Sequence, residues 1–268
     1  MSIAPRTLLF VHAHPDDEAL LTAGTMARAS AEGHRVVLVV ATDGAAGLAS
    51  SAYADDLAST RQAELAESAL ALGIARTELL GYVDSGLHGE VPGGLASADR
   101  FAVARRIAQV CDEESADVLV GYDPSGGYGH PDHLQVHRAT RAASVLCAQP
   151  PRLFEATLPR EPIARAVHFA SAVHLTPADF SASEFDTAWT PRAQITHRVD
   201  VTSHLAAKRA ALRAHASQAS ADGTVRTLGV LTRMPPMLQR LLLGTEYYVS
   251  VSDPPRERTP STAARWEE

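Results

Sequence analysis

Two short clusters of histidine and aspartate hold the residues of this chain best suited to chemistry. Residues 14–18 read His-Pro-Asp-Asp-Glu, and residues 130–133 read His-Pro-Asp-His. Each cluster follows an apolar run typical of a buried strand, residues 7–11 and residues 118–122 respectively. Because ligands bind at the carboxyl ends of the strands in an open α/β sheet, we expect both clusters to converge on one site. Imidazole and carboxylate together are the composition of a hydrolytic metal centre.

The first cluster offers ligand types that bind a divalent metal without any thiolate. With a strand ending near His14 and a helix beginning near Asp16, the side chains of His14 and Asp17 can face a common point. His133 of the second cluster would add a third ligand and leave one position open for water, as in catalytic zinc sites. Asp16 is then the natural general base, because it lies beside a water whose pKa the metal lowers.

Helix capping is the structural alternative for the aspartates of both clusters. Asp16 and Asp132 both stand near the start of a predicted helix, and an Asp at the N-cap stabilises a helix by about 1 kcal/mol. For either residue alone, capping is the simpler interpretation. Capping does not explain why a histidine stands beside the aspartate in both clusters, or why residues 126–129 read Gly-Gly-Tyr-Gly. Two separated motifs in a consistent context therefore favour the metal site.

The same motifs resemble a known family. Residues 13–18 and residues 126–133 look like the signatures of the PIG-L/LmbE family of zinc-dependent de-N-acetylases. Within it, the chain most resembles the group formed by the mycothiol-pathway deacetylase and mycothiol S-conjugate amidase. The resemblance covers most of residues 7–250 and includes four further segments: residues 42–44, 60–64, 84–86 and 208–218. It departs from the family at residues 45–47, where Ala-Ala-Gly replaces an acidic residue.

The resemblance implies a role for each residue of the two motifs. One zinc ion per chain, with Fe²⁺ as the alternative, would be bound by His14, Asp17 and His133. Asp16 would be the general base. His130, oriented by Asp132, would act as general acid or as the cationic partner of the tetrahedral oxyanion, and Tyr128 would polarise the amide carbonyl.

The resemblance also implies a set of substrate-binding residues: Asp43, Arg61, Asp84 and His215. Arg61 has a plainer interpretation as a solvated helix charge that pairs with Asp56 or Glu64. Two loops, residues 42–56 and residues 84–97, would follow strands on the same edge as the metal residues. They are candidates for walls or lids of a substrate pocket.

These features predict a metal-dependent hydrolase that removes acetyl from an N-acetylglucosaminyl glycoside or conjugate, releasing acetate and a free amine. The alternatives are an amidase of the mycothiol-conjugate type and a non-catalytic metal- or sugar-binding Rossmann-like module; Asp16 and His130 argue against the latter. A nucleotide-binding Rossmann protein needs a Gly-rich turn where residues 14–18 place carboxylates that would repel a pyrophosphate. A serine hydrolase is disfavoured because Ser125 lacks the Gly-x-Ser-x-Gly elbow.

Two further histidines lie close to the motifs. His12 alternates with His14 along the end of the first strand, so it can support the site from behind. His133 and His137 share a helix face, as in zincins, but Leu134 stands where the catalytic Glu of that motif would be. We therefore interpret His137 as a polar residue of the helix face.

Composition is that of an ordinary globular enzyme. A chain of 268 residues with 46% hydrophobic content can fill one large α/β domain. The formal net charge of −7, with no dense Lys/Arg stripe, argues against a nucleic-acid partner. No apolar run approaches the length of a membrane span and residues 1–6 do not read as a leader, which predicts a cytoplasmic protein without a membrane partner. Cys111 and Cys147 are expected to be buried free thiols, and a homo-oligomer is left open.

Hydrophobic periodicity predicts alternating strands and helices, and hence a Rossmann-like α/β fold with a mostly parallel sheet and helices on both faces. The expected strands are residues 7–11, 35–41, 78–82, 118–122, 153–157, 166–169 and 245–251. The expected helices are residues 19–32, 59–72, 99–114, 131–147 and 203–217. We expect one LmbE-like domain over residues 1–252, with a core at 7–150 and a C-terminal elaboration at 151–252. Residues 253–268 read as a disordered tail.

Overall fold

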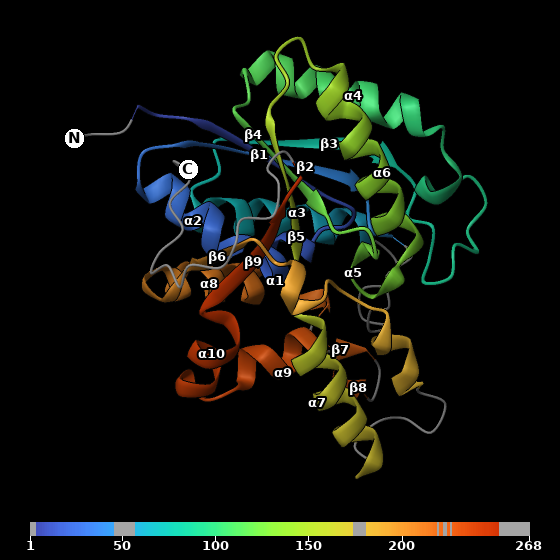
Figure 1. Cartoon of the computed structure of the whole chain (residues 1–268), viewed down its shortest axis with the longest axis vertical. Helices are drawn as coiled ribbons and strands as arrows, with labels where there is room; N and C mark the ends of the chain where they lie inside the picture. Colours follow the sequence, from blue (N-terminus) through green and yellow to red (C-terminus); the bar gives the residue numbers. More distant parts are fainter. Residues whose placement is uncertain are drawn as a thin grey trace.

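Seven strands form one sheet in the order β3-β2-β1-β4-β5-β9-β6 in a computed structural model of the chain (Figure 1). The structure describes residues 4–45, 57–173, 181–218, 220–221, 224–225 and 227–251. The strands of this sheet are β1 (Thr7–His12), β2 (Arg35–Thr42), β3 (Arg76–Tyr82), β4 (Val118–Tyr122), β5 (Arg152–Thr157), β6 (His197–Asp200) and β9 (Thr245–Ser250). A separate two-stranded ladder joins β7 (Ser220–Ala221) to β8 (Thr224–Val225).

The first five strands of the sheet are parallel, and β9 and β6 add to its edge in antiparallel pairings. β1 lies at the centre, where Leu9 pairs with Val37 of β2 on one side and with Leu119 of β4 on the other. Both β1 and β2 read as continuous apolar runs because strands of a parallel sheet are buried on both faces. The predicted α/β class with a mostly parallel sheet is confirmed.

Helices cover both faces of the sheet, as predicted. On one face lie α4 (Arg100–Glu114) and α6 (Pro131–Leu146), and on the other lie α1 (Asp17–Leu21), α2 (Ala23–Ala31), α3 (Leu57–Leu72) and α8 (Leu205–Ala214) (Figure 1). Alternation along β1 divides the core between these layers. Leu9 and Val11 join the apolar cluster under α4 and α6, whereas Leu8 and Phe10 join the cluster under the other helices.

The remaining helical segments are short. They are α5 (Gly126–Gly129), α7 (Arg160–Ala172), α9 (Thr227–Arg233) and α10 (Pro236–Leu243), with 3-10 turns at Leu95–Ser97, Ala182–Asp186, Arg192–Gln194, Thr202–His204 and Ala216–Gln218. The single helix predicted over residues 19–32 is two helices, which meet at Thr22 with a φ of −134°. There the Thr22 hydroxyl contacts Nε2 of His12 instead of facing solvent.

The strand predicted over residues 166–169 is wrong, because these residues lie inside α7. Pro162 falls in the first turn of this helix, where a missing amide hydrogen costs nothing. α7 buries no residue fully. A short apolar run in such a segment cannot be assigned to strand or helix by periodicity alone.

A buried ion pair joins the C-terminal segments to the core of the sheet. The ammonium of Lys208 in α8 contacts Oε1 of Glu246 in β9, and both side chains are 2% exposed. The same carboxylate accepts hydrogen bonds of 2.8 Å from the backbone amides of Gly24 and Thr25, in the first turn of α2. Glu246 therefore satisfies amide hydrogens that the helix cannot satisfy itself. These contacts support one domain over residues 1–252, which stays a prediction, and the predicted tail at 253–268 lies outside the described residues.

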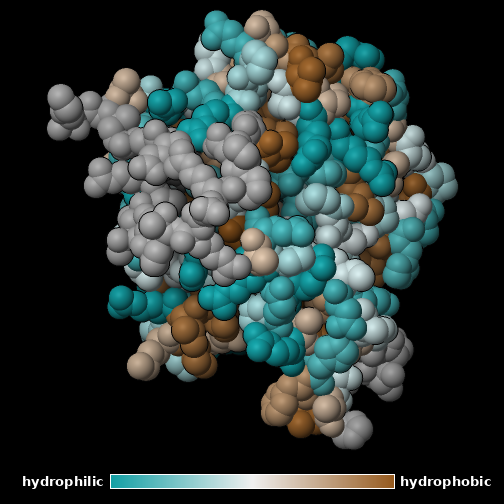
Figure 2. All heavy atoms as spheres, in the orientation of Figure 1, coloured by the Kyte–Doolittle hydropathy of each residue, from teal (hydrophilic) through white to brown (hydrophobic). Residues whose placement is uncertain are grey.

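Apolar side chains gather over α10, at the lower left of the molecule in Figure 2. The exposed apolar side chains of α10 are Met237, Leu238, Leu241 and Leu242. Among the helices that the structure describes, none is long and apolar enough to cross a membrane. Cys111 and Cys147 are buried free thiols, as predicted.

Removing the cation of the buried pair should destabilise the fold. In Lys208→Met the Glu246 carboxylate stays buried without its charge partner, and we expect the free energy of unfolding to fall by about 3–5 kcal/mol. Urea denaturation measures the change. The control is Arg105→Met, which breaks an ion pair to Asp99 whose side chains are both 66% exposed and should cost less than about 1 kcal/mol. Equal effects of the two variants would contradict a structural role for the buried pair.

Candidate active site and metal centre

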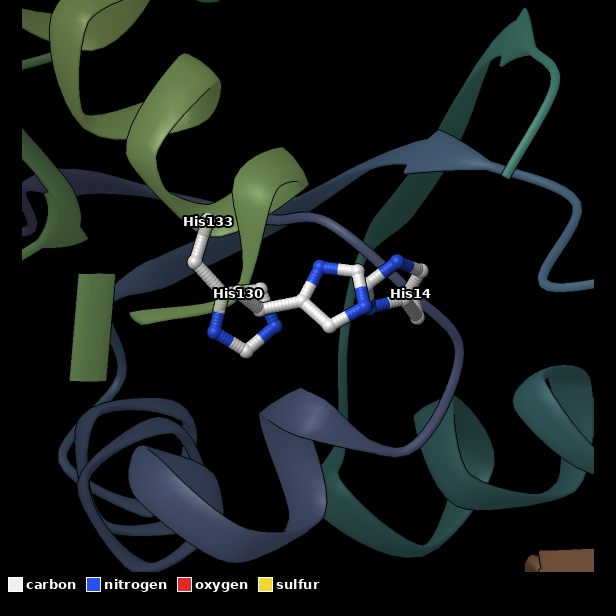
Figure 3. A group of neighbouring side chains, drawn as sticks. All are labelled: His14, His130 and His133. Atoms are coloured by element: carbon white, nitrogen blue, oxygen red, sulfur yellow. The ribbon is translucent and has the colours of Figure 1, made fainter. Parts of the chain in front are cut away.

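Three imidazole rings meet at the carboxyl ends of β1 and β4, where the order of the sheet reverses. His14 follows β1, His130 precedes α6, and His133 lies in the first turn of α6 (Figure 3). The ring centroids of His14 and His130 are 4.6 Å apart, and those of His130 and His133 are 4.9 Å apart. One nitrogen from each ring lies within 4.8 Å of the others, so this group could hold a metal ion.

The Asp17 carboxylate lies between two of these rings. Its Oδ2 atom is 3.2 Å from Nδ1 of His14 and 3.3 Å from Nε2 of His133. The same oxygen accepts a hydrogen bond of 2.7 Å from the hydroxyl of Tyr122, the last residue of β4. The structure therefore places His133 beside His14 and Asp17, although it lies far along the chain from them.

The tautomer of His133, with its hydrogen on Nδ1, suits a metal ligand. Its Nδ1 atom donates a hydrogen bond of 3.1 Å to the carbonyl oxygen of Gly126, so in the neutral ring the lone pair is on Nε2. His133 is 1% exposed, and among the described residues its Nε2 atom has no hydrogen-bond partner. A histidine whose far nitrogen is fixed by a carbonyl while its near nitrogen is unsatisfied is the usual arrangement of a metal-binding imidazole. The residues thus fit a divalent cation.

Carboxylates surround His14 on both sides. Its Nε2 atom is 3.2 Å from Oδ2 of Asp132 and 3.6 Å from Oδ1 of Asp84. Burial disfavours the charged ring, but the hydrogen bonds to Asp132 and Asp17 outweigh it and raise the pKa of His14 to about 10. His14, Asp84 and Asp132 form a second group that could hold a cation. The surroundings of His14 therefore favour positive charge.

Helix capping does not account for either aspartate. Asp16 precedes α1, but its side chain makes no capping hydrogen bond, and its φ of 122° is far from a helical value. The cap of α6 is His130, whose Nδ1 accepts a hydrogen bond from the backbone amide of Asp132. The carboxylate of Asp132 instead contacts His14, and that of Asp16 lies against the guanidinium of Arg61. Burial raises the pKa of Asp16 against the opposing effect of Arg61.

His130 is a neutral ring in this arrangement. Burial, together with His14 and His133, lowers its pKa to about 4. Because Nδ1 accepts from the Asp132 amide, the ring proton is on Nε2. The expected orientation of His130 by the Asp132 carboxylate is not the contact observed, since that carboxylate contacts His14 and the backbone amide of Ser85.

Tyr128 lies at the rim of the cluster and is 46% exposed. Its ring centroid is 5.3 Å from that of His133 and 6.5 Å from that of Trp189. The turn that carries it has Gly127 at a φ of 66°, and this glycine donates its amide hydrogen to Oδ1 of Asp123 and accepts one from the Trp189 amide. Asp123 and Trp189 thereby fix the position of the tyrosine.

Arg61, one of the predicted substrate-binding residues, is buried and does not lie on a solvent-exposed helix face. The interpretation as a solvated helix charge is therefore wrong; Asp56 lies outside the described residues. Its guanidinium donates to the carbonyl oxygens of Gly44 and Pro15 and lies 3.3 Å from Oδ1 of Asp16. Arg61 is therefore positioned to hold Asp16.

The other predicted substrate-binding residues occupy three environments. Asp84 is buried beside His14. Asp43 is exposed, and its carboxylate accepts a hydrogen bond from the Ala45 amide. His215 is fully buried and contacts Glu18. The loop at residues 84–97 begins at the cluster, because the Ser85 amide binds Asp132. Residues 46–56 of the other predicted loop lie outside the described residues.

Several residues of the site carried no recognisable sequence signal. Tyr122 reads as an ordinary strand residue, yet its hydroxyl also accepts the Ala13 amide hydrogen and lies 3.4 Å from Nδ1 of His12. The support predicted for His12 thus reaches Asp17 through Tyr122. Asp123 accepts hydrogen bonds from the hydroxyls of Thr157 and Thr190. A polar residue at the end of a buried strand is the one signal that could have identified Tyr122 and Asp123.

His137 does not face solvent freely. Its Nδ1 atom donates a hydrogen bond of 2.9 Å to the Tyr122 carbonyl oxygen and lies 3.3 Å from the buried carboxylate of Glu155. These contacts point His137 toward β4 and β5, away from the imidazole cluster. The structure gives it a role in holding α6 on the sheet.

An α/β sheet with buried histidines and carboxylates at its switch point is the arrangement of a metal-dependent hydrolase. Residues 9–144 match the family described as PIG-L, GlcNAc-PI de-N-acetylase. The chain belongs to this PIG-L family.

Relatives support the same assignment. The chain is 38% identical over 253 residues to the 1D-myo-inositol 2-acetamido-2-deoxy-alpha-D-glucopyranoside deacetylase of Kineococcus radiotolerans, covering 81% of this chain and 70% of the relative. It is 35% identical over 290 residues to the protein of the same name from Thermomonospora curvata, covering 98% and 95%. The fold is similar to that of N,N'-diacetylchitobiose deacetylase from Pyrococcus horikoshii, with a TM-score of 0.57, 22% identity, and coverage of 92% of this chain and 83% of that one.

The turn that carries Tyr128 leaves no room for a side chain at Gly127. A Cβ there would lie 2.7 Å from Cη2 of Trp189, in addition to the strain of a positive φ. We expect Gly127→Ala to lower the free energy of unfolding by about 2–5 kcal/mol, the sum of left-handed strain and overpacking. Gly129→Ala is the control, because Gly129 also has a positive φ, but a Cβ on it would meet no atom within 4 Å. Urea denaturation compares them, and equal losses would show that contact with Trp189 is unimportant.

Proposed function

We propose that this chain hydrolyses the N-acetyl amide of an N-acetylglucosaminyl glycoside or conjugate, releasing acetate and a free amine. The observation that carries the proposal is the Nε2 atom of His133, which has no hydrogen-bond partner and lies beside Asp17 and His14. Asp16, the residue before Asp17, adds a second carboxylate to this segment. Relatives named as deacetylases of an acetamido sugar support the substrate class.

The metal would be held by His14, Asp17 and His133. Two imidazoles and one carboxylate form a donor set that suits zinc, which we propose over Fe²⁺. When bound, zinc supplies a Lewis acid that polarises an amide carbonyl and lowers the pKa of water. Asp132 and Asp84 lie around His14 and add to the negative charge that a cation would balance.

The protein residues would move a proton from the attacking water to the departing amine. Asp16 removes a proton from the attacking water, for which its raised pKa and its place beside Asp17 suit it. The hydroxyl of Tyr128 donates a hydrogen bond to the carbonyl oxygen as negative charge develops on it. His130, which is neutral, donates its Nε2–H as a hydrogen bond to the reacting group, and a proton that Asp16 took from water passes to the departing amine as the C–N bond breaks, so that acetate and free amine are released.

The substrate would enter beside Tyr128, which is the exposed member of the cluster. We propose that the carboxylates of Asp84 and Asp43 bind hydroxyl groups of the sugar. The contacts of Arg61 and His215 favour a different role, which is to support the segment around Asp16. A mycothiol-conjugate amidase would use the same groups on a different amide, and the names of the relatives favour deacetylation. A cytoplasmic location, the absence of nucleic-acid and membrane partners, and the oligomeric state stay predictions.

Acetate release from a panel of N-acetylglucosaminides tests the function directly. We expect release by the zinc-loaded protein, its loss with a chelator, and its return when zinc is added. In Asp16→Asn the water has no base, so turnover should fall by about 10²–10⁴-fold while zinc content stays unchanged. Full activity of Asp16→Asn would show that another group is the base. A wild-type protein that releases no acetate from any member of the panel would overturn the proposal.

Metal content tests the ligand assignment separately. His133→Ala removes the unsatisfied imidazole, and we expect the purified protein to retain well under one zinc per chain after dialysis. His168→Ala is the matched control, because His168 is an exposed histidine paired with Asp186. Elemental analysis of both proteins gives the result. Undiminished zinc in His133→Ala would require a different ligand set, such as one that includes His130.

A further inference from the structure

The backbone at Asp16 is strained, and something must hold it there. Its φ of 122° lies in the region that residues other than glycine rarely adopt. Such a conformation costs about 1–3 kcal/mol and persists only where the surrounding structure fixes it. Because Asp16 is the proposed base, the groups that hold its backbone also fix the direction of its carboxylate.

Glu18 supplies one of these contacts from within α1. Its Oε2 atom accepts a hydrogen bond of 2.9 Å from the backbone amide of Asp16. The side chain of Glu18 is fully buried, so it cannot exchange this contact for water without a large cost. The contact runs back along the chain from Glu18 to Asp16, and so holds the backbone of the base close to α1.

Two residues from distant parts of the chain hold Glu18. The hydroxyl of Ser68 in α3 and Nε2 of His215, just after α8, each donate a hydrogen bond of 2.6 Å to its Oε1 atom. Both partners are fully buried. A side chain with both oxygens occupied by three donors has one orientation, so Ser68 and His215 determine where Oε2 points.

Arg61 holds the same segment from the other side. Its guanidinium donates to the carbonyl oxygen of Pro15 and lies 3.3 Å from Oδ1 of Asp16. The peptide group that joins Pro15 to Asp16 therefore has two buried polar partners, Arg61 on its carbonyl oxygen and Glu18 on its amide hydrogen. Arg61 contacts the carboxylate itself, whereas Glu18, Ser68 and His215 touch only the backbone or each other.

We propose that Glu18, fixed by Ser68 and His215, is a positioning residue that holds the strained backbone of Asp16 and so aims its carboxylate at the attacking water. The inference rests on the proposed function, in which Asp16 is the base. It gives His215 a role that differs from substrate binding, the role that the family resemblance implies. The buried position of His215 against Glu18 favours the positioning role.

The two roles predict different kinetics. A positioning residue acts in the chemical step, so its loss lowers kcat and leaves KM close to the wild-type value. A substrate contact made equally in the ground and transition states raises KM instead. A misplacement of about 1 Å in a catalytic group can cost about 10²-fold in rate, which makes the effect easy to detect.

The decisive series changes His215 while Glu18 stays in place. In His215→Leu the donor to Glu18 is lost, and we expect kcat for acetate release to fall by about 100-fold with KM unchanged within about 2-fold. In His215→Gln an amide nitrogen can replace Nε2 as donor, so kcat should recover to within about 10-fold of wild type. Zinc content should stay at the wild-type level in both variants.

Ser68→Ala provides a second test that barely changes packing. Removing its hydroxyl should lower kcat by about 5-fold, the effect of one weakened hydrogen bond, again at constant KM. Ser144→Ala is the control, because the exposed hydroxyl of Ser144 contacts only the Arg141 carbonyl oxygen in its own helix. Circular dichroism and urea denaturation verify that each variant is folded.

The outcomes separate this inference from the proposed function. A wild-type protein without deacetylase activity would overturn the proposed function itself. An active wild type whose His215→Leu and Ser68→Ala variants keep kcat, or raise KM at constant kcat, would overturn the positioning role alone. Loss of zinc in His215→Leu would also overturn it, because the residue would then act through the metal ligands.

Discussion

The convergence of polar groups on Oδ2 of Asp17 is the interaction on which the rest of the site depends. His14, His133 and Tyr122 reach this one oxygen from three different segments, the end of β1, the start of α6 and the end of β4. The pairing of β1 with β4 places these segments side by side, so the register of the central strands decides whether the cluster can form. Asp132 and Asp84 add further carboxylates around His14. Against the effect of burial, the neighbouring histidines lower the pKa of Asp17 and the pKa of Asp132, so positive charge stabilises these buried carboxylates.

The C-terminal part of the chain is needed because the core alone cannot satisfy its own polar groups. The first turn of α2 and the carboxylate of Glu18 are both buried under α8 and β9. Glu246 binds the amides of that turn, and His215 binds Glu18. On the other side of the site, the segment around Trp189 fixes the turn that carries Tyr128. The parallel core therefore supplies the residues proposed as catalytic, and the later segments determine how those residues are held.

The sequence predicted what depends on local pattern. The strands at residues 7–11 and 118–122 were recognisable because parallel strands are apolar throughout, and the motif residues His14, Asp17 and His133 follow from the rule that sites lie at strand ends. The strand at residues 166–169 was predicted wrongly, because a run of four residues is too short for its apolar pattern to distinguish a strand from a helix. The burial of Arg61 and His215 could not be predicted, since their partners lie far away along the chain. Such long-range polar contacts follow from the complete fold and leave no periodic trace.

The same strand end differs from the turn that binds a nucleotide in dinucleotide-binding proteins of this fold class. In a dinucleotide-binding Rossmann protein, glycines after the first strand let a pyrophosphate approach the amides of a helix start. In this chain, Asp16, Asp17 and Glu18 occupy that turn, and the Asp16 amide is already bound by Glu18. The strained φ of Asp16 is one that a glycine would adopt without cost. With an aspartate at this position the backbone is strained, but a carboxylate stands where a nucleotide-binding protein has only backbone amides. The turn therefore carries negative charge and suits a cation and its water better than an anion.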